Sequence, residues 1–271
     1  DTERSRIGEE RFRREHECEF LIFDETLISS LTLADMEGVP PVETTGQVRW
    51  FKRPTPGMTY LVSLDPSMGT GGDYAAIQIF ELPTFEQIGE WHHNMTPMNK
   101  QVQILQGINK HIHDTIIERD SSASPQIFYS MENNTIGEAA LMRVMDIGEE
   151  NIMGMFLSEP IRKGHRRKFR RGFNTTAKHK IDACTKFKEL VEGGKMKINS
   201  QLLISEMKDF VATGLSYKAK PGQHDDLVSS CLLMTRMMKV LADFDPKIFE
   251  KWTDRTSELT TPMPIFGNFY G

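Results

Sequence analysis

The chain has 271 residues, 38% of them hydrophobic, and a formal net charge of -5. Its length and hydrophobic content suit one substantial domain with attached arms. No apolar run is long enough to span a membrane, and the amino-terminal residues lack signal-peptide character. Three widely separated cysteines indicate neither a disulfide framework nor a zinc site, so we expect a soluble protein of a reducing cytoplasm.

Residues 1–57 are expected to form an arm and a connector. Residues 9–20 are rich in helix formers and in charges of both signs, which is typical of a solvated helical face. Pro40 and Pro41 open a proline-containing connector with one short extended stretch at 47–51. We therefore place a domain boundary before Met58, with the folded unit at 58–243 and a tail at 244–271.

The folded unit is predicted to begin with an apolar strand that ends in a carboxylate. Residues 58–64 are apolar on both faces, as in the centre of a covered sheet, and Asp65 and Pro66 end the strand. The glycine-rich run 69–72 permits a tight turn, and a second strand follows from Asp73 to Phe80. Asp65 could simply cap this turn, as aspartate often does.

A similar pattern recurs later in the chain. After a strand at 87–93 and a helix at 97–119, a fourth strand at 126–131 runs into Glu132, and a short helix at 136–145 and a possible strand at 153–157 follow. The neighbours His92 and His93 would point to opposite faces of their strand, so we do not expect both to bind one ion. Glu132 is thus a second acid at the end of a core strand.

The last part of the folded unit is predicted to be mainly helical. Helices are expected at 177–192 and 200–211, with short extended pieces at 195–198 and 215–219. In the final helix an apolar stripe recurs at helical spacing and indicates core rather than a cofactor site. Asp225 and Asp226 lie in its first turn, where the helix dipole favours carboxylates, so capping explains one of the pair. Because successive residues turn about 100° apart, only one should face a metal squarely.

A basic segment interrupts the acidic chain. Between residues 162 and 180 there is no acidic residue, and the segment is either a solvated loop or a loop that holds phosphates. Phe169, Gly172 and Phe173 interleave the charges and favour the second interpretation. Its basic residues are Arg162, Lys163, Arg166, Arg167, Lys168, Arg170, Arg171, Lys178 and Lys180.

The order of these elements resembles the ribonuclease H-like fold, which implies an α/β protein with a central mixed sheet and helices on both faces. Four motifs together resemble the carboxy-terminal nuclease domain of tailed-bacteriophage large terminase subunits, over residues 58–241. The motifs are Leu64-Asp65-Pro66-Ser67, Met131-Glu132-Asn133-Asn134, Gly172-Phe173-Asn174-Thr175-Thr176 and His224-Asp225-Asp226-Leu227-Val228.

This resemblance implies a metal-dependent endonuclease that cuts concatemeric double-stranded viral DNA during genome packaging, with little sequence specificity. Asp65, Glu132 and Asp225 would be the catalytic, metal-binding triad, with Asp73 and Asp226 as further metal ligands and His224 in support. Carboxylate oxygens suit Mg²⁺ or Mn²⁺, and two such ions about 3.5–4 Å apart can activate water and stabilise the leaving oxygen. The basic residues 162–171 would bind DNA phosphates.

The resemblance also implies partners and a place of action. Residues 7–21 look like the end of a terminase motor region, but no phosphate-binding loop is present: Gly193-Gly194-Lys195 is followed by Met196 where serine or threonine is needed. We therefore expect no ATPase activity from this chain. The absent ATPase motor, a portal ring and a small terminase subunit would be its partners, in the cytoplasm of the infected bacterial host and away from any membrane.

Two alternatives remain open at this point. A Holliday junction resolvase-like or transposase-like nuclease would share the fold, although a resolvase would normally be a compact dimer without the motor remnant. A non-catalytic module that grips DNA in the packaging motor would use the acids only in turns and caps. DNA binding without cleavage in any divalent metal would favour the gripping module.

Overall fold

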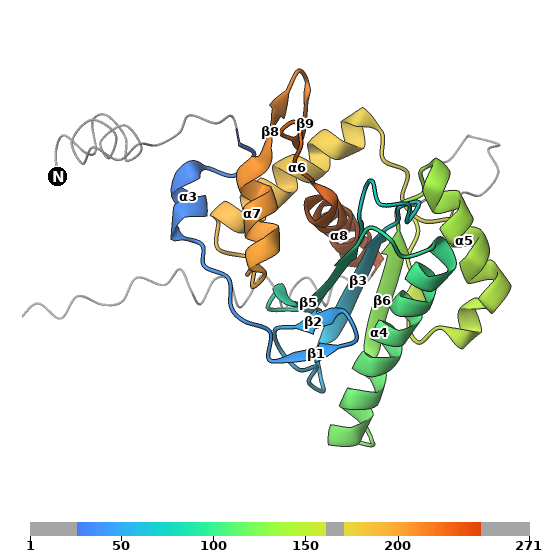
Figure 1. The fold of residues 1–271 in the computed structure, drawn as a ribbon. Coiled ribbons are helices and arrows are strands. Elements are labelled where there is room, and N and C mark those ends of the chain that lie inside the picture. Colours follow the sequence, from blue (N-terminus) through green and yellow to red (C-terminus); the bar gives the residue numbers. More distant parts are fainter. Residues whose placement is uncertain (1–25, 161–170, 245–271) are drawn as a thin grey trace, which may run out of the picture.

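A seven-stranded mixed sheet forms the centre of the molecule. The computed structural model describes residues 26–160 and 171–244, and the sheet has the order β1-β2-β5-β4-β3-β6-β7 (Figure 1). The pairs from β1 through β2, β5 and β4 to β3 are antiparallel, whereas β6 is parallel to β3 and β7 is parallel to β6. The strands are β1 Glu43–Thr45, β2 Val48–Trp50, β3 Thr59–Asp65, β4 Ala75–Leu82, β5 Glu86–His93, β6 Gln126–Met131 and β7 Met155–Phe156.

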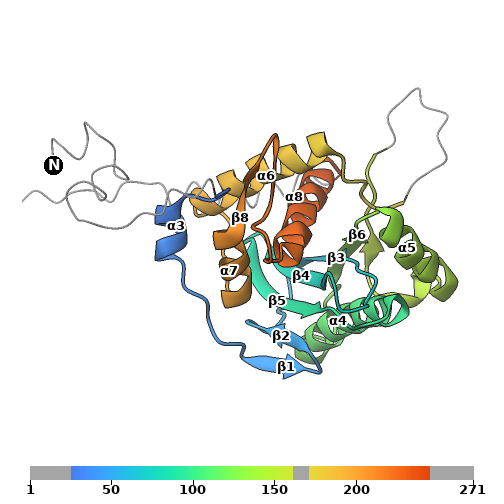
Figure 2. The same ribbon diagram turned by 45° about the horizontal axis from the view of Figure 1, so that its top comes forward.

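Helices cover both faces of this sheet, as Figure 2 shows, and the predicted α/β class with a mixed sheet is confirmed. The neighbouring residues Leu61 and Val62 of β3 point into different apolar cores. One core contains residues of α6, α7 and α8, and the other contains residues of α4 and α5. These helices are α4 Met98–Arg119, α5 Thr135–Ile147, α6 Ala177–Glu192, α7 Gln201–Asp209 and α8 Asp226–Phe244.

Two deeply buried elements, β3 and α8, are those that the sequence marks most clearly. Strand β3 lies between β4 and β6, and all its residues except Asp65 are buried. The stripe of α8 is also buried, and it packs over β3 and β4. Its residues are Leu227, Cys231, Met234, Met238 and Leu241. Among the described residues, no helix is long and apolar enough to cross a membrane.

Residues 26–57 belong to the folded unit, so Met58 is not a structural boundary. Helix α3 (Ser30–Asp35) follows the buried residues Leu27 and Ile28, which join the core around α7. Strand β2 pairs with β5, and its Trp50 is buried. The connector is part of the domain because these apolar side chains need the sheet and α7 to leave water. The arm at 9–20 and the tail from 245 lie outside the described residues.

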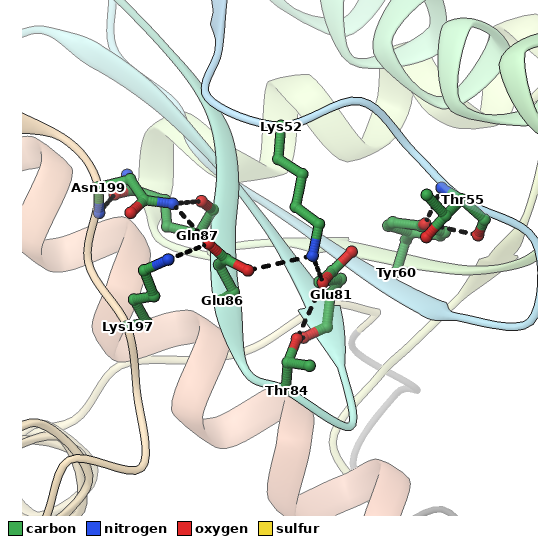
Figure 3. Close-up of polar contacts among 9 residues, drawn as sticks. All are labelled: Lys52, Thr55, Tyr60, Glu81, Thr84, Glu86, Gln87, Lys197 and Asn199. Carbon is green, nitrogen blue, oxygen red and sulfur yellow. Dashed lines mark hydrogen bonds and ion pairs between the residues drawn. The ribbon is translucent and has the colours of Figure 1, made fainter. Parts of the chain in front are cut away.

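A polar network ties this connector to the sheet (Figure 3). Lys52 forms ion pairs with Glu81 of β4 and with Glu86 of β5, the latter at 3.1 Å. On the other side of Glu86, Lys197 donates to the same carboxylate at 2.7 Å, and the Asn199 amide donates to the Gln87 carbonyl at 2.7 Å. The start of β5 is thereby linked both to the connector and to the chain entering α7.

Two predicted elements differ from the structure. The strand expected at 195–198 is reduced to one bridge between Lys197 and Glu86, because the chain turns at once so that Ser200 can cap α7. The helix expected at 200–211 ends at Asp209, and the chain continues in a hairpin of β8 (Phe210–Thr213) and β9 (Ser216–Ala219). Phe210 is buried there, so packing overrides local helix preference.

Candidate active site

The register of the central strands brings two predicted acids together. Strands β3 and β6 are parallel, and Leu64 is the partner of Met131. Asp65 and Glu132 are therefore the next pair, at the carboxyl ends of strands that lie about 4.8 Å apart in any sheet. The Glu132 N–H continues the ladder by donating to the Leu64 carbonyl at 3.1 Å.

The turn after β6 holds the Glu132 carboxylate. Asn134 caps α5 by accepting the Gly137 N–H at 2.7 Å, and its amide donates to Glu132 Oε2 at 3.0 Å. Helix α5 approaches so closely that a Cβ at Gly137 would lie 1.8 Å from the Glu132 carbonyl oxygen. A glycine is required there because the first turn of α5 contacts the backbone that carries Glu132.

A buried serine pair places the start of α8 over the end of β3. The hydroxyls of Ser63 and Ser230 lie 2.8 Å apart, and each also lies within hydrogen-bond distance of the other residue's carbonyl, at 2.9 and 3.1 Å, so that their two protons are shared among these acceptors. Ser63 precedes Asp65 by two residues, and Ser230 lies one helical turn after Asp226. These bonds therefore fix Asp225 and Asp226 relative to Asp65.

A third acid, Glu206 of α7, caps α8 from the side. Its Oε2 accepts the N–H groups of Leu227 at 2.9 Å and Val228 at 3.1 Å. Burial raises the pKa of Glu206 to about 9, the two N–H bonds oppose this rise, and repulsion from Asp226 and Asp225 adds to it. Glu206 is thus an uncharged acid at neutral pH and a helix cap.

The carboxylates perturb one another strongly. Burial raises the pKa of Asp65 well above its usual range, and repulsion from Glu132, from Asp226 and then from Asp225 raises it further, as does a hydrogen bond with Glu132. Burial also raises the pKa of Asp226 to about 6. Repulsion of this kind is expected where several carboxylates lie close together, and a bound cation would stabilise their charged forms.

The remaining predicted site residues lie on the outer side of Asp226. Its Oδ2 accepts the Tyr74 N–H at 3.3 Å and lies 3.7 Å from His224 Nδ1, and Asp73 contributes to its raised pKa. The Tyr74 ring stacks on His92 with centroids 4.0 Å apart. Burial lowers the pKa of His92 to about 4, so this imidazole is neutral and serves as an aromatic packing partner.

A small cavity of about 170 Å³ opens between the two acid-bearing strand ends, α6 and α8. Asp65 and Glu132 line it from the sheet, and Lys180 and Arg236 line it from the helices. Asp225 is a neighbour of Lys180: its Oδ2 accepts the Ala219 N–H at 3.3 Å and lies 3.8 Å from the Lys180 ammonium. Two carboxylates and two basic side chains thus line the same cavity.

The donors of this cluster fit a hard divalent cation, since they are carboxylate oxygens and the described chain offers no thiolate here. In the residues that the structure describes, no group of three or more histidine, cysteine, aspartate or glutamate side chains converges as metal ligands would. The carboxylates instead satisfy their oxygens with protein donors: Asn134 for Glu132, Ala219 for Asp225 and Tyr74 for Asp226. Side-chain rotation is therefore required before they could share an ion.

Most of the basic segment lies outside the described residues. This applies to the predicted DNA ligands Arg162, Lys163, Arg166, Arg167, Lys168 and Arg170, whereas Arg171 forms an ion pair with Glu149. The two ends of the segment are joined where they leave the sheet. Glu159 N–H donates to the Gly172 carbonyl at 3.2 Å, and Arg236 of α8 contacts both Glu159 and, at 3.0 Å, the Asn174 carbonyl. The described residues that flank the segment are thereby anchored beside the cavity.

Comparison with known proteins decides the family. The model of the terminase RNaseH-like domain matches residues 62–237, well over half of the chain. The chain belongs to this family. The matched region contains every acid of the cluster described above, so the family assignment and the site rest on the same residues.

Solved structures of terminase nucleases share the fold. The large terminase nuclease from thermophilic phage G20c superposes with a TM-score of 0.56 at 17% identity, over 77% of this chain and 96% of that chain. The same nuclease with bound magnesium gives 0.57 at 17% identity, over 78% and 97%. The large terminase nuclease domain of Thermus phage P74-26 gives 0.53 at 17% identity, over 74% and 90%. The ribonuclease H-like architecture of this terminase-family domain is thus confirmed.

Sequence reasoning missed the residues that support the acids. Ser63 and Ser230 are polar residues within otherwise apolar core elements, and this signal could have marked them. Glu206 and Arg236 carry no such signal, since a charged residue in a helix is usually solvated. Only the packing of α7 and α8 shows that both are partly buried beside the site.

Proposed function

We propose that this terminase-family domain is a metal-dependent endonuclease that cuts concatemeric double-stranded viral DNA during genome packaging, with little sequence specificity. The observation that carries the proposal is the cluster of Asp65, Glu132, Asp225 and Asp226 at the carboxyl ends of β3 and β6 and the start of α8, with a cavity beside it. Isolated caps would not place Glu132, Asp226 and Asp225 where, beside burial, all three raise the pKa of Asp65.

The chain's own residues have defined tasks in this proposal. Asp65 and Glu132 would hold Mg²⁺ or Mn²⁺ from the sheet, and Asp225 and Asp226 would hold it from α8, with Asp73 and His224 in support. Two such ions, when bound, supply an activated water and neutralise charge on the phosphorane and the leaving 3′-oxygen. The G20c nuclease with bound magnesium and the same nuclease with bound cobalt support the use of a divalent cation.

The binding of DNA would rest on the basic segment. Its two ends are anchored next to the cavity by Glu159 and Arg236, so phosphates held by residues 162–171 would lie near the acids. Phosphate contacts carry no base information, which agrees with low sequence specificity. By family likeness, the ATPase motor, the portal ring and the small terminase subunit would be partners in the host cytoplasm.

Plasmid cleavage tests the proposal. The purified chain is incubated with supercoiled plasmid in Mg²⁺, in Mn²⁺ and in chelator, beside Asp65→Asn and the exposed control Asp35→Asn. We expect metal-dependent nicking and linearisation that Asp65→Asn abolishes and Asp35→Asn retains, while both variants still bind duplex. Binding without cleavage by the unmodified chain in every metal would contradict the proposal and identify a DNA-gripping module instead.

A further inference from the structure

Lys180 is a cation inside the acidic cavity. It lies in the first turn of α6, whose cap Thr176 accepts the His179 N–H at 3.2 Å. The side chain is one quarter exposed, and its ammonium lies 3.8 Å from Asp225 Oδ2. It lines the same 170 Å³ space as Asp65 and Glu132. The helix therefore presents a positive charge to the point where the acids meet.

The other cation of the cavity is already committed to the structure. The Arg236 guanidinium donates to Thr175 Oγ1 and to the Asn174 carbonyl, each at 3.0 Å, and forms an ion pair with Glu159. It also lies 5.2 Å from the centroid of the Phe173 ring. Moving this side chain would break several bonds at once, so Arg236 is a structural residue.

Lys180 is held much more loosely. Among the residues that the structure describes, its one ion pair is with Asp225 and is near the limit of direct contact, and its ammonium lies 5.5 Å from the centroid of the buried Phe210 ring. The Phe210 ring keeps the Lys180 side chain against one wall of the cavity. This contact leaves the N–H donors of the ammonium available, because the ring attracts the charge and accepts no specific hydrogen bond. An ammonium has three donors, so Lys180 can leave Asp225 for another acceptor without reorganising the fold.

We propose that Lys180 is a catalytic residue of the nuclease, which donates a hydrogen bond to a non-bridging oxygen of the scissile phosphate. The inference rests on the proposed function. Lys180 lies 3.8 Å from Asp225 and neutralises part of its charge. A divalent cation held by that carboxylate would weaken this ion pair and leave the ammonium free to donate to the phosphate.

The step needs only the reactants of hydrolysis. A water oxygen forms a bond to phosphorus, the bond from phosphorus to the 3′-oxygen breaks, and the proton lost by the water balances the one gained by the 3′-oxygen. Lys180 keeps its own protons throughout. Its contribution is to stabilise the charge that accumulates on the phosphoryl oxygens, in a site whose four acids would otherwise repel the substrate.

Single-turnover cleavage of plasmid in Mg²⁺ tests the proposal, with variants Lys180→Ala and Lys180→Arg and the control Lys188→Ala, an exposed lysine about two turns further along the same helix. We expect Lys180→Ala to lower the rate about 10²-fold, as the loss of one transition-state donor does. Lys180→Arg should recover much of the rate, and Lys188→Ala should leave it unchanged. Duplex affinity, measured in the Asp65→Asn background, should change less than about threefold, because one phosphate contact contributes little to the total.

Chemical rescue separates a catalytic role from a structural one. Added propylammonium should restore part of the rate of Lys180→Ala and leave the unmodified chain unaffected, because only a missing charge can be replaced from solution. An unchanged rate in Lys180→Ala, or a loss that neither Lys180→Arg nor propylammonium restores, would overturn the inference. If Asp65→Asn abolishes cleavage while Lys180→Ala cleaves at the rate of the unmodified chain, the inference alone fails; if the unmodified chain never cleaves, the proposed function fails.

Discussion

Glu206 should make the stability of the metal-free protein depend on pH. This acid lies between α7 and the first turn of α8, and burial raises its pKa from 4.5 to about 9. Because the folded-state pKa is above the unfolded-state value, the stability that protonated Glu206 provides is fully present below pH 4.5 and is lost as the pH rises toward 9. Replacing it with glutamine removes this titration.

The size of the effect follows from the shift. Between the two pKa values, each pH unit lowers the free energy of unfolding by about 1.4 kcal/mol, which amounts to about 3 kcal/mol at pH 7. Glu206→Gln keeps an oxygen that can accept the Leu227 and Val228 N–H groups, so its helix cap remains. We therefore expect the variant to be more stable than the unmodified chain by about 3 kcal/mol at pH 7, with little difference near pH 4.5.

Urea unfolding in chelator at pH 5, 6, 7 and 8 measures this difference. The control is Glu189→Gln, a change of an exposed glutamate on α6, and its effect on stability should be small at every pH. A gap between Glu206→Gln and the unmodified chain that does not grow with pH would refute the reasoning. It would mean that the positive end of the α8 dipole keeps Glu206 ionised despite its burial.

Two further predictions concern the supports of the site. Gly137→Ala should destabilise the fold by roughly 1–3 kcal/mol in thermal unfolding and lower plasmid cleavage, because its Cβ would collide with the Glu132 carbonyl. The control is Gly107→Ala, which is exposed in α4 and free of such contacts and should instead stabilise the fold by about 0.5–1 kcal/mol. Equal effects of the two changes on stability would show that no such collision occurs. Ser230→Ala should lower the free energy of unfolding by about 1 kcal/mol. In a double-mutant cycle with Ser63→Ala the two losses of stability should not add, since each hydroxyl is the other's hydrogen-bond partner. Strict additivity would show that the pair does not couple β3 to α8.

The sequence by itself determined the elements with strong local signals. The apolar run before Asp65, the stripe of α8 and the helix expected at 177–192 all correspond to elements that the structure contains within a few residues. These signals are local because strand and helix periodicity, and the capping of free N–H groups, depend on residues close in the chain. The order of the acid-ended elements was enough to predict the ribonuclease H-like sheet.

Only the tertiary structure decided what surrounds the acids. The bond between Ser63 and Ser230 joins residues 167 positions apart, and the placement of Lys180 against Asp225 depends on how α6 packs beside α8. The membership of residues 26–57 in the domain likewise depends on β2 pairing with β5. Contacts of this kind arise from burial and side-chain packing between distant elements, which leave no periodic trace in any one stretch of sequence.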